Sequence, residues 1–416
     1  MKAGKLGAAG RPGKRPAPAA AGGPDFAVAR HFRYLPQLDG IRALAVGAVV
    51  AQHAELSVAR GGGVGVDVFF VLSGYLITTL LLQEFDRHGT ISMRNFYARR
   101  ARRLLPALFA VAAISLVAFS IVRPYLTHDT LVGILASVLY VSCWFRAFGV
   151  SELGWFGHTW SLSVEEHFYL LWPPLLLLIL RKGLRNLRRW VLLALGVAVA
   201  YRVGSSVFLH AGGARMNGPD MRADQLLTGC ALAVLFLDIG RPSEHGDGPA
   251  PPWWDRWLTL AVVVSILDLA RIVVFPYALG LTFAKDASPE FVALESAIIV
   301  TYVVRRAASP LTRFLSHRSL VWLGRRSYAI YLWHVPLFGL FSLKGHPTSE
   351  RLAGRAAACV LTLVAAWASF RWVESPFYRR RVEQPATADD GAPPPEEPAP
   401  LAAPAATGDR ARDLAG

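Results

Sequence analysis

The sequence contains few charged residues and almost no cysteine. Only 18% of its 416 residues are charged, whereas soluble domains carry about a quarter, and 53% are hydrophobic. Cys143, Cys230 and Cys359 each stand in an apolar stretch, without a second cysteine at metal-ligand spacing. This scarcity argues against a disulfide-stabilised scaffold and a zinc site, and we expect no metal. The low charge and a mean hydropathy of +0.36 indicate an integral membrane protein instead.

Long apolar runs fill the chain between two low-complexity ends. Since about 20 residues cross the hydrocarbon core, we identify candidate spans at 41–59, 64–82, 104–122, 131–148, 164–181, 190–209, 222–239, 256–276, 289–305, 327–344 and 353–371. Basic residues collect at 83–103, 181–189 and 305–326 and near both chain ends, and the positive-inside rule assigns such segments to the cytoplasm. An even number of crossings must then lie between 103 and 181, so we expect 131–163 to dip into the membrane without crossing it.

The expected fold is all-α: a polytopic membrane helix bundle of about ten transmembrane helices plus the membrane-dipping segment. Residues 34–378 form its membrane domain. Residues 1–33 carry seven basic residues and one acidic residue, and residues 379–416 are rich in proline and alanine. Neither end can bury enough apolar surface to fold, so we expect disordered cytoplasmic tails. The net charge of +15 lies in tails and short connections, which makes membrane lipid a partner and argues against nucleic acid.

The first span carries Arg42 and His53. They share a helix face and stand about 16 Å apart by helix rise. Polar groups at membrane depth are costly and usually face a protein interior or a wet cavity. Histidine exchanges protons near neutral pH, so His53 is a candidate general base, with Arg42 near the cytoplasmic mouth. The alternative is an interfacial arginine and a histidine that hydrogen-bonds a neighbouring helix.

A glycine-rich turn precedes the second span, which contains Asp67 and Ser73. No lysine follows the glycines, so the turn is not a phosphate-binding loop. Asp67 is expected to cap the helix, and Ser73 with Gly74 offers a small-residue surface for close helix approach. Structural roles are therefore favoured for these residues.

Four arginines, Arg99, Arg100, Arg102 and Arg103, stand at the start of the third span. Guanidinium groups bind phosphates through paired hydrogen bonds, and a phosphorylated, nucleotide-like donor would arrive from this side. The four arginines are therefore candidates for donor binding. The competing interpretation is that their charge only fixes the orientation of the chain.

The motif at 158–173 leads into the fifth apolar stretch. Glu165, Phe168, Tyr169 and Trp172 share one helix face, where a carboxylate among aromatic rings can orient a sugar hydroxyl or the histidine. Trp160 and Ser161 precede this face. The segment also has the spacing of a capping box, with Ser163 and Glu166 as its members, which would leave Glu165 free.

Two shorter motifs complete the candidate site. Arg222 and Asp224 open a span as a candidate ion pair. Tyr331 and His334 stand just before Pro336, which kinks its helix. A lone histidine in such a helix more often packs than catalyses.

These motifs together resemble the membrane-bound acyltransferase-3 family, whose members O-acylate surface polysaccharides, peptidoglycan and some secreted antibiotics. The resemblance extends from about Leu35 to Pro376. It rests on LDGIRA with its following histidine, GVDVFFVLSGYLI, RRARRLLPAL, HTWSLSVEEHFYLLWP, MRADQLLTG, SYAIYLWH and WVESP. One departure is His167, which replaces the glutamine usual at that position.

The resemblance implies an acyl-CoA donor, with acetyl-CoA as the expected co-substrate, and transfer to a hydroxyl. It implies that Arg42 and His53 are the essential pair, with His53 as general base or, as the alternative, as carrier of the acyl group. It also implies that the arginines between 99 and 103 bind the donor. The acceptor is a surface glycan or another glycosylated molecule, with a secreted macrolide-type antibiotic as the alternative. A transporter of small molecules or lipid-linked glycans is the alternative class, although the sequence has no evident internal repeats. The expected location is the bacterial plasma membrane, with many spans and both termini in the cytoplasm.

The orientation generates a labelling prediction. In a cysteine-free background, Lys182→Cys should resist a membrane-impermeant thiol reagent in intact cells, because 181–189 is expected inside. His128→Cys, in a segment expected outside, is the matched control and should react. Strong labelling of Lys182→Cys from outside would contradict the ten-crossing arrangement.

Overall fold

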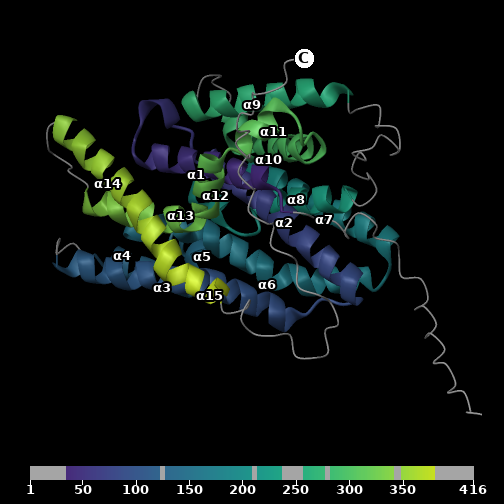
Figure 1. The fold of residues 1–416 in the computed structure, drawn as a ribbon, viewed down its shortest axis with the longest axis horizontal. Helices are drawn as coiled ribbons and strands as arrows, with labels where there is room; N and C mark the ends of the chain where they lie inside the picture. Colours follow the sequence, from purple (N-terminus) through teal and green to yellow (C-terminus); the bar gives the residue numbers. More distant parts are fainter. Residues whose placement is uncertain are drawn as a thin grey trace, which may run out of the picture. The chain divides into compact units, whose positions relative to one another are not determined.

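The computed structural model describes residues 34–121, 127–208, 213–236, 256–276, 282–341 and 348–379. The predicted tails, apart from Arg379, and the ends of several predicted spans lie outside these residues. All regular structure in the described part is helical (Figure 1), as predicted. The helices are α1 (Pro36–His53), η2 (Ser57–Ala59), α2 (Val64–His88), α3 (Met93–Ile121), α4 (His128–Val138), α5 (Ser142–Ala147), η3 (Gly154–Thr159), α6 (Trp160–Leu180), α7 (Leu184–Phe208), η4 (Gly213–Asn217), α8 (Ala223–Leu235), α9 (Leu258–Val274), α10 (Thr282–Arg305), α11 (Pro310–Leu315), α12 (Arg318–Arg325), α13 (Ser327–Leu340), α14 (Thr348–Ala368), η6 (Ser369–Glu374) and α15 (Ser375–Arg379).

Five helical stretches of the described chain are long and apolar enough to cross a membrane. They are Ser57–His88, Met93–Ile121, Gly154–Leu180, Asn186–Phe208 and Ser349–Phe377. Large apolar side chains on their outer faces are exposed, among them Leu171 and Val197, as expected for helices surrounded by lipid. The larger count of about ten spans stays a prediction.

The first helix is displaced from its predicted position. The apolar run predicted a helix over 41–59, but α1 begins at Pro36 and ends at His53. Proline suits the first helical position because its fixed φ is already helical and no N–H is needed there. His53 is therefore the last residue of α1, whereas the predicted helix continued for six residues beyond it.

Two segments predicted as basic loops are largely helical. α2 continues to His88, where Gly89 ends it with a φ of 66°, and α3 begins at Met93, so the four arginines belong to α3. Arginine and alanine are good helix formers, which explains this extension. Between 305 and 326 the chain forms α11 and α12.

The segment 131–163, predicted to enter the membrane without crossing it, consists of short helices. α4 has 11 residues and α5 has 6, so neither is long enough to cross the hydrocarbon. Thr127 caps α4 by accepting a hydrogen bond from the Thr130 N–H at 3.2 Å. Tyr140, between α4 and α5, has a φ of 55°, a left-handed backbone conformation that interrupts the helix.

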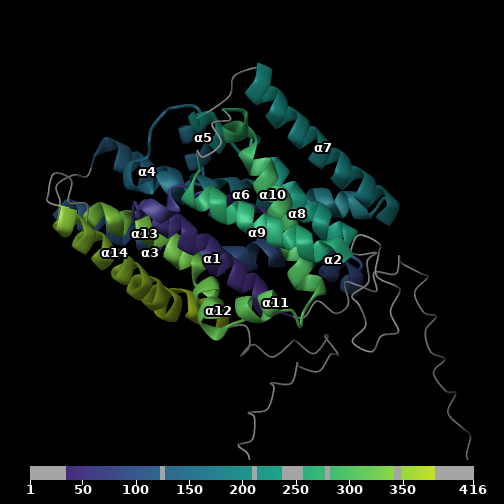
Figure 2. The same cartoon turned by 90° about the horizontal axis from the view of Figure 1, so that it is seen from above.

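Close backbone approach joins the central helices. α2 packs along α8, and α1 packs against α2, α12 and α13; Figure 2 shows α1 among them. A Cβ on Gly74 of α2 would lie 1.9 Å from the carbonyl oxygen of Leu226 in α8. A Cβ on Gly229 of α8 would lie 2.1 Å from the carbonyl oxygen of Val71 in α2. The two helices therefore meet backbone to backbone at Gly74 and Gly229, as the small-residue pattern predicted for Gly74, whereas Ser73 donates a hydrogen bond to Glu165 of α6 instead.

This contact generates a stability prediction. Gly74→Leu should force α2 and α8 apart and cost about 1–3 kcal/mol or more, the range for overpacking a core. The measurement is thermal unfolding of purified protein in detergent. Gly47→Leu is the matched control, since a Cβ there meets no atom within 4 Å. Equal unfolding temperatures for both variants would show that the close approach is not needed.

Candidate active site

A cavity of about 440 Å³ lies among α1, α2, α3, α6 and α13. Ligand-binding pockets are typically about 300–1,000 Å³ in volume. Its apolar wall includes Leu38, Leu72, Leu76, Ile77 and Leu104. Its polar wall brings together residues that the sequence predicted as site residues, namely Arg42, Ser73, Arg100, Arg103, Ser161, Glu165, Tyr169 and Tyr331.

Glu165 stands at the centre of the polar wall. Its Oε1 accepts a hydrogen bond from the Ser73 hydroxyl at 2.8 Å, and its Oε2 accepts one from the Tyr169 hydroxyl at 3.2 Å. Ser73 comes from α2, whereas Tyr169 lies one turn further along α6. The predicted helix face of Glu165 and Tyr169 therefore faces the cavity. Glu166 also lines it.

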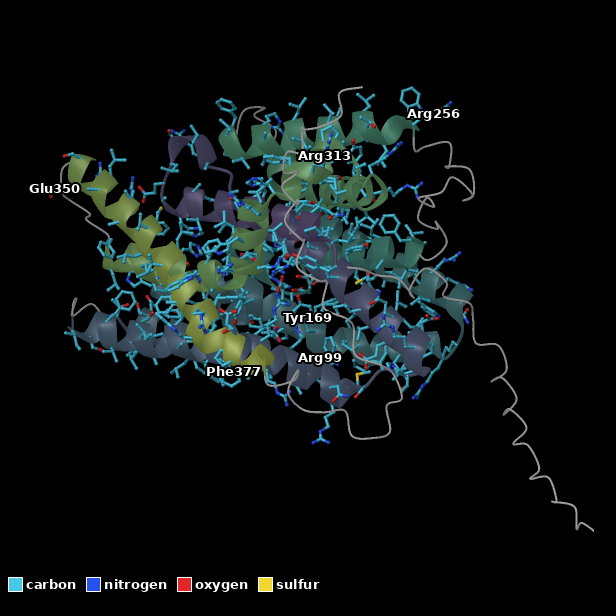
Figure 3. All side chains as sticks on the ribbon, in the orientation of Figure 1. Arg99, Tyr169, Arg256, Arg313, Glu350 and Phe377 are labelled. Atoms are coloured by element: carbon cyan, nitrogen blue, oxygen red, sulfur yellow. The ribbon has the colours of Figure 1, made fainter. Side chains whose placement is uncertain are left out.

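The four arginines divide into two pairs. Arg100 lies over the ring of Tyr169, 3.2 Å from its centroid, and forms an ion pair with Glu166 at 3.5 Å. Arg103, one turn along α3, also lines the cavity, and its charge acts on the carboxylates of Glu374 and Glu166. Arg99 pairs with Glu84 at 3.0 Å and is exposed, as is Arg102. Figure 3 labels Arg99 and the buried Tyr169.

Arg42 lies at the end of the cavity where α1 begins. Its Nη1 is 3.9 Å from Oδ1 of Asp39, and its guanidinium carbon lies 6.0 Å from the ring centroid of Phe69. Tyr34 donates a hydrogen bond to Asp39 and accepts one from Arg325 at 3.1 Å. This end of the cavity is therefore next to two segments predicted to be cytoplasmic, the start of α1 and the basic segment 305–326.

His53 lies outside the cavity lining, at the other end of α1. Its Nδ1 is 2.9 Å from the Val49 carbonyl oxygen. A carbonyl only accepts, so Nδ1 carries the proton and Nε2 keeps its lone pair. The ring centroid of His334 is 4.9 Å from that of His53, and the centroid of His158 is 5.0 Å from that of His334. The structure thus adds His158, which the sequence placed in a motif without assigning it a role.

Ser161 and Tyr331 separate the cavity from these histidines. Their hydroxyl oxygens are 2.7 Å apart, and the Tyr331 hydroxyl donates to the His158 carbonyl oxygen at 2.8 Å. Both side chains line the cavity. Among the described residues, no group of three histidine, cysteine or acidic side chains has the arrangement of a metal site.

Arg222 and Asp224 do not form the pair suggested by their spacing. Arg222 pairs with Asp67 at 2.7 Å, and Asp224 pairs with Arg202 at 3.2 Å. Asp67 therefore does not cap α2 as predicted, because its carboxylate turns toward α8 and neutralises the partly buried Arg222. Arg222 lies 5.2 Å from the ring centroid of Trp160.

None of the four charged side chains of these pairs lines the cavity; they are Asp67, Arg202, Arg222 and Asp224. Arg202 is fully buried and is 3.1 Å from Glu290 as well. Breaking a buried pair typically costs about 3–5 kcal/mol, so these residues hold the helices around the site in register.

The predicted capping box is also wrong. α6 begins at Trp160, one turn earlier than expected, so Ser163 lies inside the helix and its hydroxyl donates to the Tyr140 carbonyl. His167 accepts a hydrogen bond from the Trp144 indole at 3.1 Å and is directed toward α5. It lines a second cavity, of about 350 Å³, and not the first.

Comparison with known proteins identifies the class. Residues 35–371 match the acyltransferase domain that defines the acyltransferase-3 family, and the chain belongs to this family, as the motifs predicted. The match covers every residue of the cavity wall except Tyr34. No solved structure was found to match the chain.

Three relatives are named as O-acetyltransferases. The chain is 34% identical over 354 residues to peptidoglycan O-acetyltransferase OatA of Listeria monocytogenes, covering 83% of this chain and 56% of that protein. It is 33% identical to putative peptidoglycan O-acetyltransferase YrhL of Bacillus subtilis, covering 83% and 55%. It is 30% identical to O-acetyltransferase OatA of Staphylococcus aureus, covering 84% and 58%. The chain thus spans little more than half the length of these relatives.

Proposed function

We propose that this protein is a membrane O-acyltransferase that moves an acetyl group from acetyl-CoA to a hydroxyl of a cell-envelope glycan. The main support for this proposal is that Arg42, Arg100 and Arg103 line one cavity in a chain of the acyltransferase-3 family. The names of the relatives favour peptidoglycan as the acceptor over a macrolide-type antibiotic. Membership of an acyltransferase family favours an enzyme over a transporter.

The donor enters at the Arg42 end of the cavity. Arg103 and Arg42, which both line the cavity, bind its phosphates. The apolar wall formed by α1 and α2 accommodates the pantetheine arm and directs the thioester toward Ser161 and Tyr331. Support comes from the basic segments on either side of this end, which the positive-inside rule assigns to the cytoplasm, where acyl-CoA is made. The protein lies in the bacterial plasma membrane with both termini in the cytoplasm.

His53 is the general base in this proposal. Nε2 holds a lone pair because Nδ1 donates to Val49, so it can accept the acceptor's hydroxyl proton. The thioester has to reach past Ser161 and Tyr331 to the His53 end of α1 for this step. The hydroxyl oxygen then attacks the thioester carbon, the C–O bond forms, the C–S bond breaks, and the CoA thiolate takes the proton from the His53 imidazolium. Glu165 and Tyr169 hold the wall of the donor cavity through their hydrogen bonds, and neither is exposed enough to meet a large glycan directly.

The base assignment is tested by His53→Ala. Removing a general base typically costs about 10²–10⁴-fold in rate, while folding should change little because His53 is exposed at a helix end. The assay follows labelled acetyl transfer from acetyl-CoA to soluble peptidoglycan fragments by purified protein. His88→Ala is the matched control, since His88 ends α2 and its Nδ1 contacts the Glu84 carbonyl at 3.1 Å in the same way. Parental activity in folded His53→Ala protein would refute the assignment.

The division of the arginines is tested by paired Arg→Lys variants. Lysine keeps the charge but loses the planar fork that binds phosphate. Arg100→Lys with Arg103→Lys should therefore raise the KM for acetyl-CoA about ten- to a hundredfold, the equivalent of losing one charge-assisted contact worth about 1.5–3 kcal/mol. Arg99→Lys with Arg102→Lys should leave this KM near the parental value, because both side chains are exposed. The opposite ranking would move the donor phosphates away from the cavity.

A further inference from the structure

Another arginine, Arg325, stands just outside the donor cavity at its Arg42 end. It is the last residue of α12, and its Nε donates a hydrogen bond to the Tyr34 hydroxyl at 3.1 Å. Its guanidinium carbon lies 4.9 Å from the ring centroid of Tyr34. Tyr34 is exposed and also lines the cavity, so the cavity opens to the surface here. This end, formed by Tyr34, Asp39 and Arg42, is the mouth of the cavity.

Two arginines share the Asp39 carboxylate at the mouth. Oδ1 of Asp39 is 3.9 Å from Nη1 of Arg42, and its Oδ2 is 3.7 Å from Nε of Arg325. One carboxylate offsets only one of these two positive charges, so the mouth keeps a positive charge. A cleft lined by a surplus of one charge attracts ions of the opposite sign. The mouth therefore favours an anionic ligand.

Close backbone contacts fix the position of Arg325 against α1. A Cβ on Gly324, its neighbour in α12, would lie 1.9 Å from the carbonyl oxygen of Asp39. A Cβ on Gly40 would lie 2.0 Å from the carbonyl oxygen of Leu315 in α11. The start of α1 thus packs directly on α11 and α12, which Figure 2 shows beside it. The two guanidinium groups at the mouth are therefore held at a fixed separation, which lowers the entropic cost of binding a ligand that contacts both.

The Arg325 side chain is accessible in spite of its contacts. It is 54% exposed, whereas the side chain of Arg42 is 19% exposed. The contacts of Arg325 use Nε and the face of the guanidinium. The edge formed by the two Nη groups is the one that binds a phosphate through two parallel hydrogen bonds. An exposed ion pair contributes only about 0–1 kcal/mol to stability, so stability gives little reason for this arrangement.

The direction of the bound donor follows from the two ends of the cavity. In the proposed function the thioester points inward, toward Ser161 and Tyr331, and the pantetheine arm extends from there to the mouth. The nucleotide at the other end of the donor then projects out of the mouth. Coenzyme A carries a pyrophosphate next to the pantetheine arm and a separate phosphate on the 3′ oxygen of its ribose. With the pyrophosphate at Arg42, the 3′-phosphate lies on the outer side of the mouth, where Arg325 stands.

We infer that Arg325 binds the 3′-phosphate of the acyl-CoA donor. This inference rests on the proposed function and divides the donor's phosphates between two places. Arg42 and Arg103 hold the pyrophosphate inside the cavity, and Arg325, fixed by Tyr34 and Asp39, holds the 3′-phosphate outside it. The enzyme is therefore selective for a donor that carries this phosphate over the same thioester without it.

Kinetics with two donors test the assignment. The purified parent protein should show a KM about ten- to a hundredfold higher for acetyl-3′-dephospho-CoA than for acetyl-CoA, as expected for the loss of one charge-assisted contact, with a similar kcat. Arg325→Gln should raise the KM for acetyl-CoA to nearly the same value and leave the KM for the dephospho donor unchanged. If Arg325 only supported Tyr34 and Asp39, the substitution would raise both KM values together.

Arg313→Gln is the matched control. Arg313 is exposed on α11 (Figure 3) and does not line the cavity, so its loss removes the same charge and should leave the preference for acetyl-CoA at the parental level. Arg325→Lys keeps the charge beside Asp39 but loses the fork, and it should lose most of the preference while unfolding at the parental temperature.

Three results would overturn the assignment while acetyl transfer stands. They are equal KM values of the parent protein for the two donors, a rise of both KM values in Arg325→Gln, and an equal effect of Arg313→Gln and Arg325→Gln. Failure of the parent protein to transfer acetyl from either donor would instead refute the proposed function together with this inference.

Discussion

A charge inside an apolar helix bundle has to be paired, and this constraint arranges the whole interior. Arg202, fully buried, lies between Asp224 and Glu290, and Arg222 faces Asp67 across α2 and α8. These pairs are destabilising when broken, so they fix how α2, α7, α8 and α10 meet. The cavity lies on the opposite side of α2 from this group, and its position depends on that register.

In the proposed function, the cavity and His53 divide the chemistry between the two ends of α1. Arg42 lies near one end and His53 ends the other, and the Ser161–Tyr331 pair stands between their surroundings. A donor with phosphates needs fixed guanidinium groups in a closed pocket, whereas a polymeric glycan needs an open surface. The buried wall around Glu165 meets the first requirement, and the exposed His53 meets the second. Both residues lie within 35–371, the part of the chain that matches the acyltransferase domain.

The sequence predicts what depends on local pattern. Apolar runs reveal the helices, and helical periodicity brings Glu165 and Tyr169 to one face, where they are hydrogen-bonded. Periodicity also separates Arg100 and Arg103 from Arg99 and Arg102, but which pair faces inward depends on Tyr169 of α6.

Contacts between distant segments cannot be predicted in this way. Asp67 and Arg222 are 155 residues apart, and their pairing follows from the glycine contact between α2 and α8. His158 meets His334 because η3 packs against α13.

The Ser161–Tyr331 pair has a consequence for the energy supply of the cell. A protein with polar sites near both membrane faces would drain the ion gradient if those sites joined as an open channel, and each charge crossing 100 mV releases about 2.3 kcal/mol. The hydrogen bond between the Ser161 and Tyr331 hydroxyl groups, 2.7 Å long, leaves no space for a hydrated ion between these two side chains and so opposes such a leak.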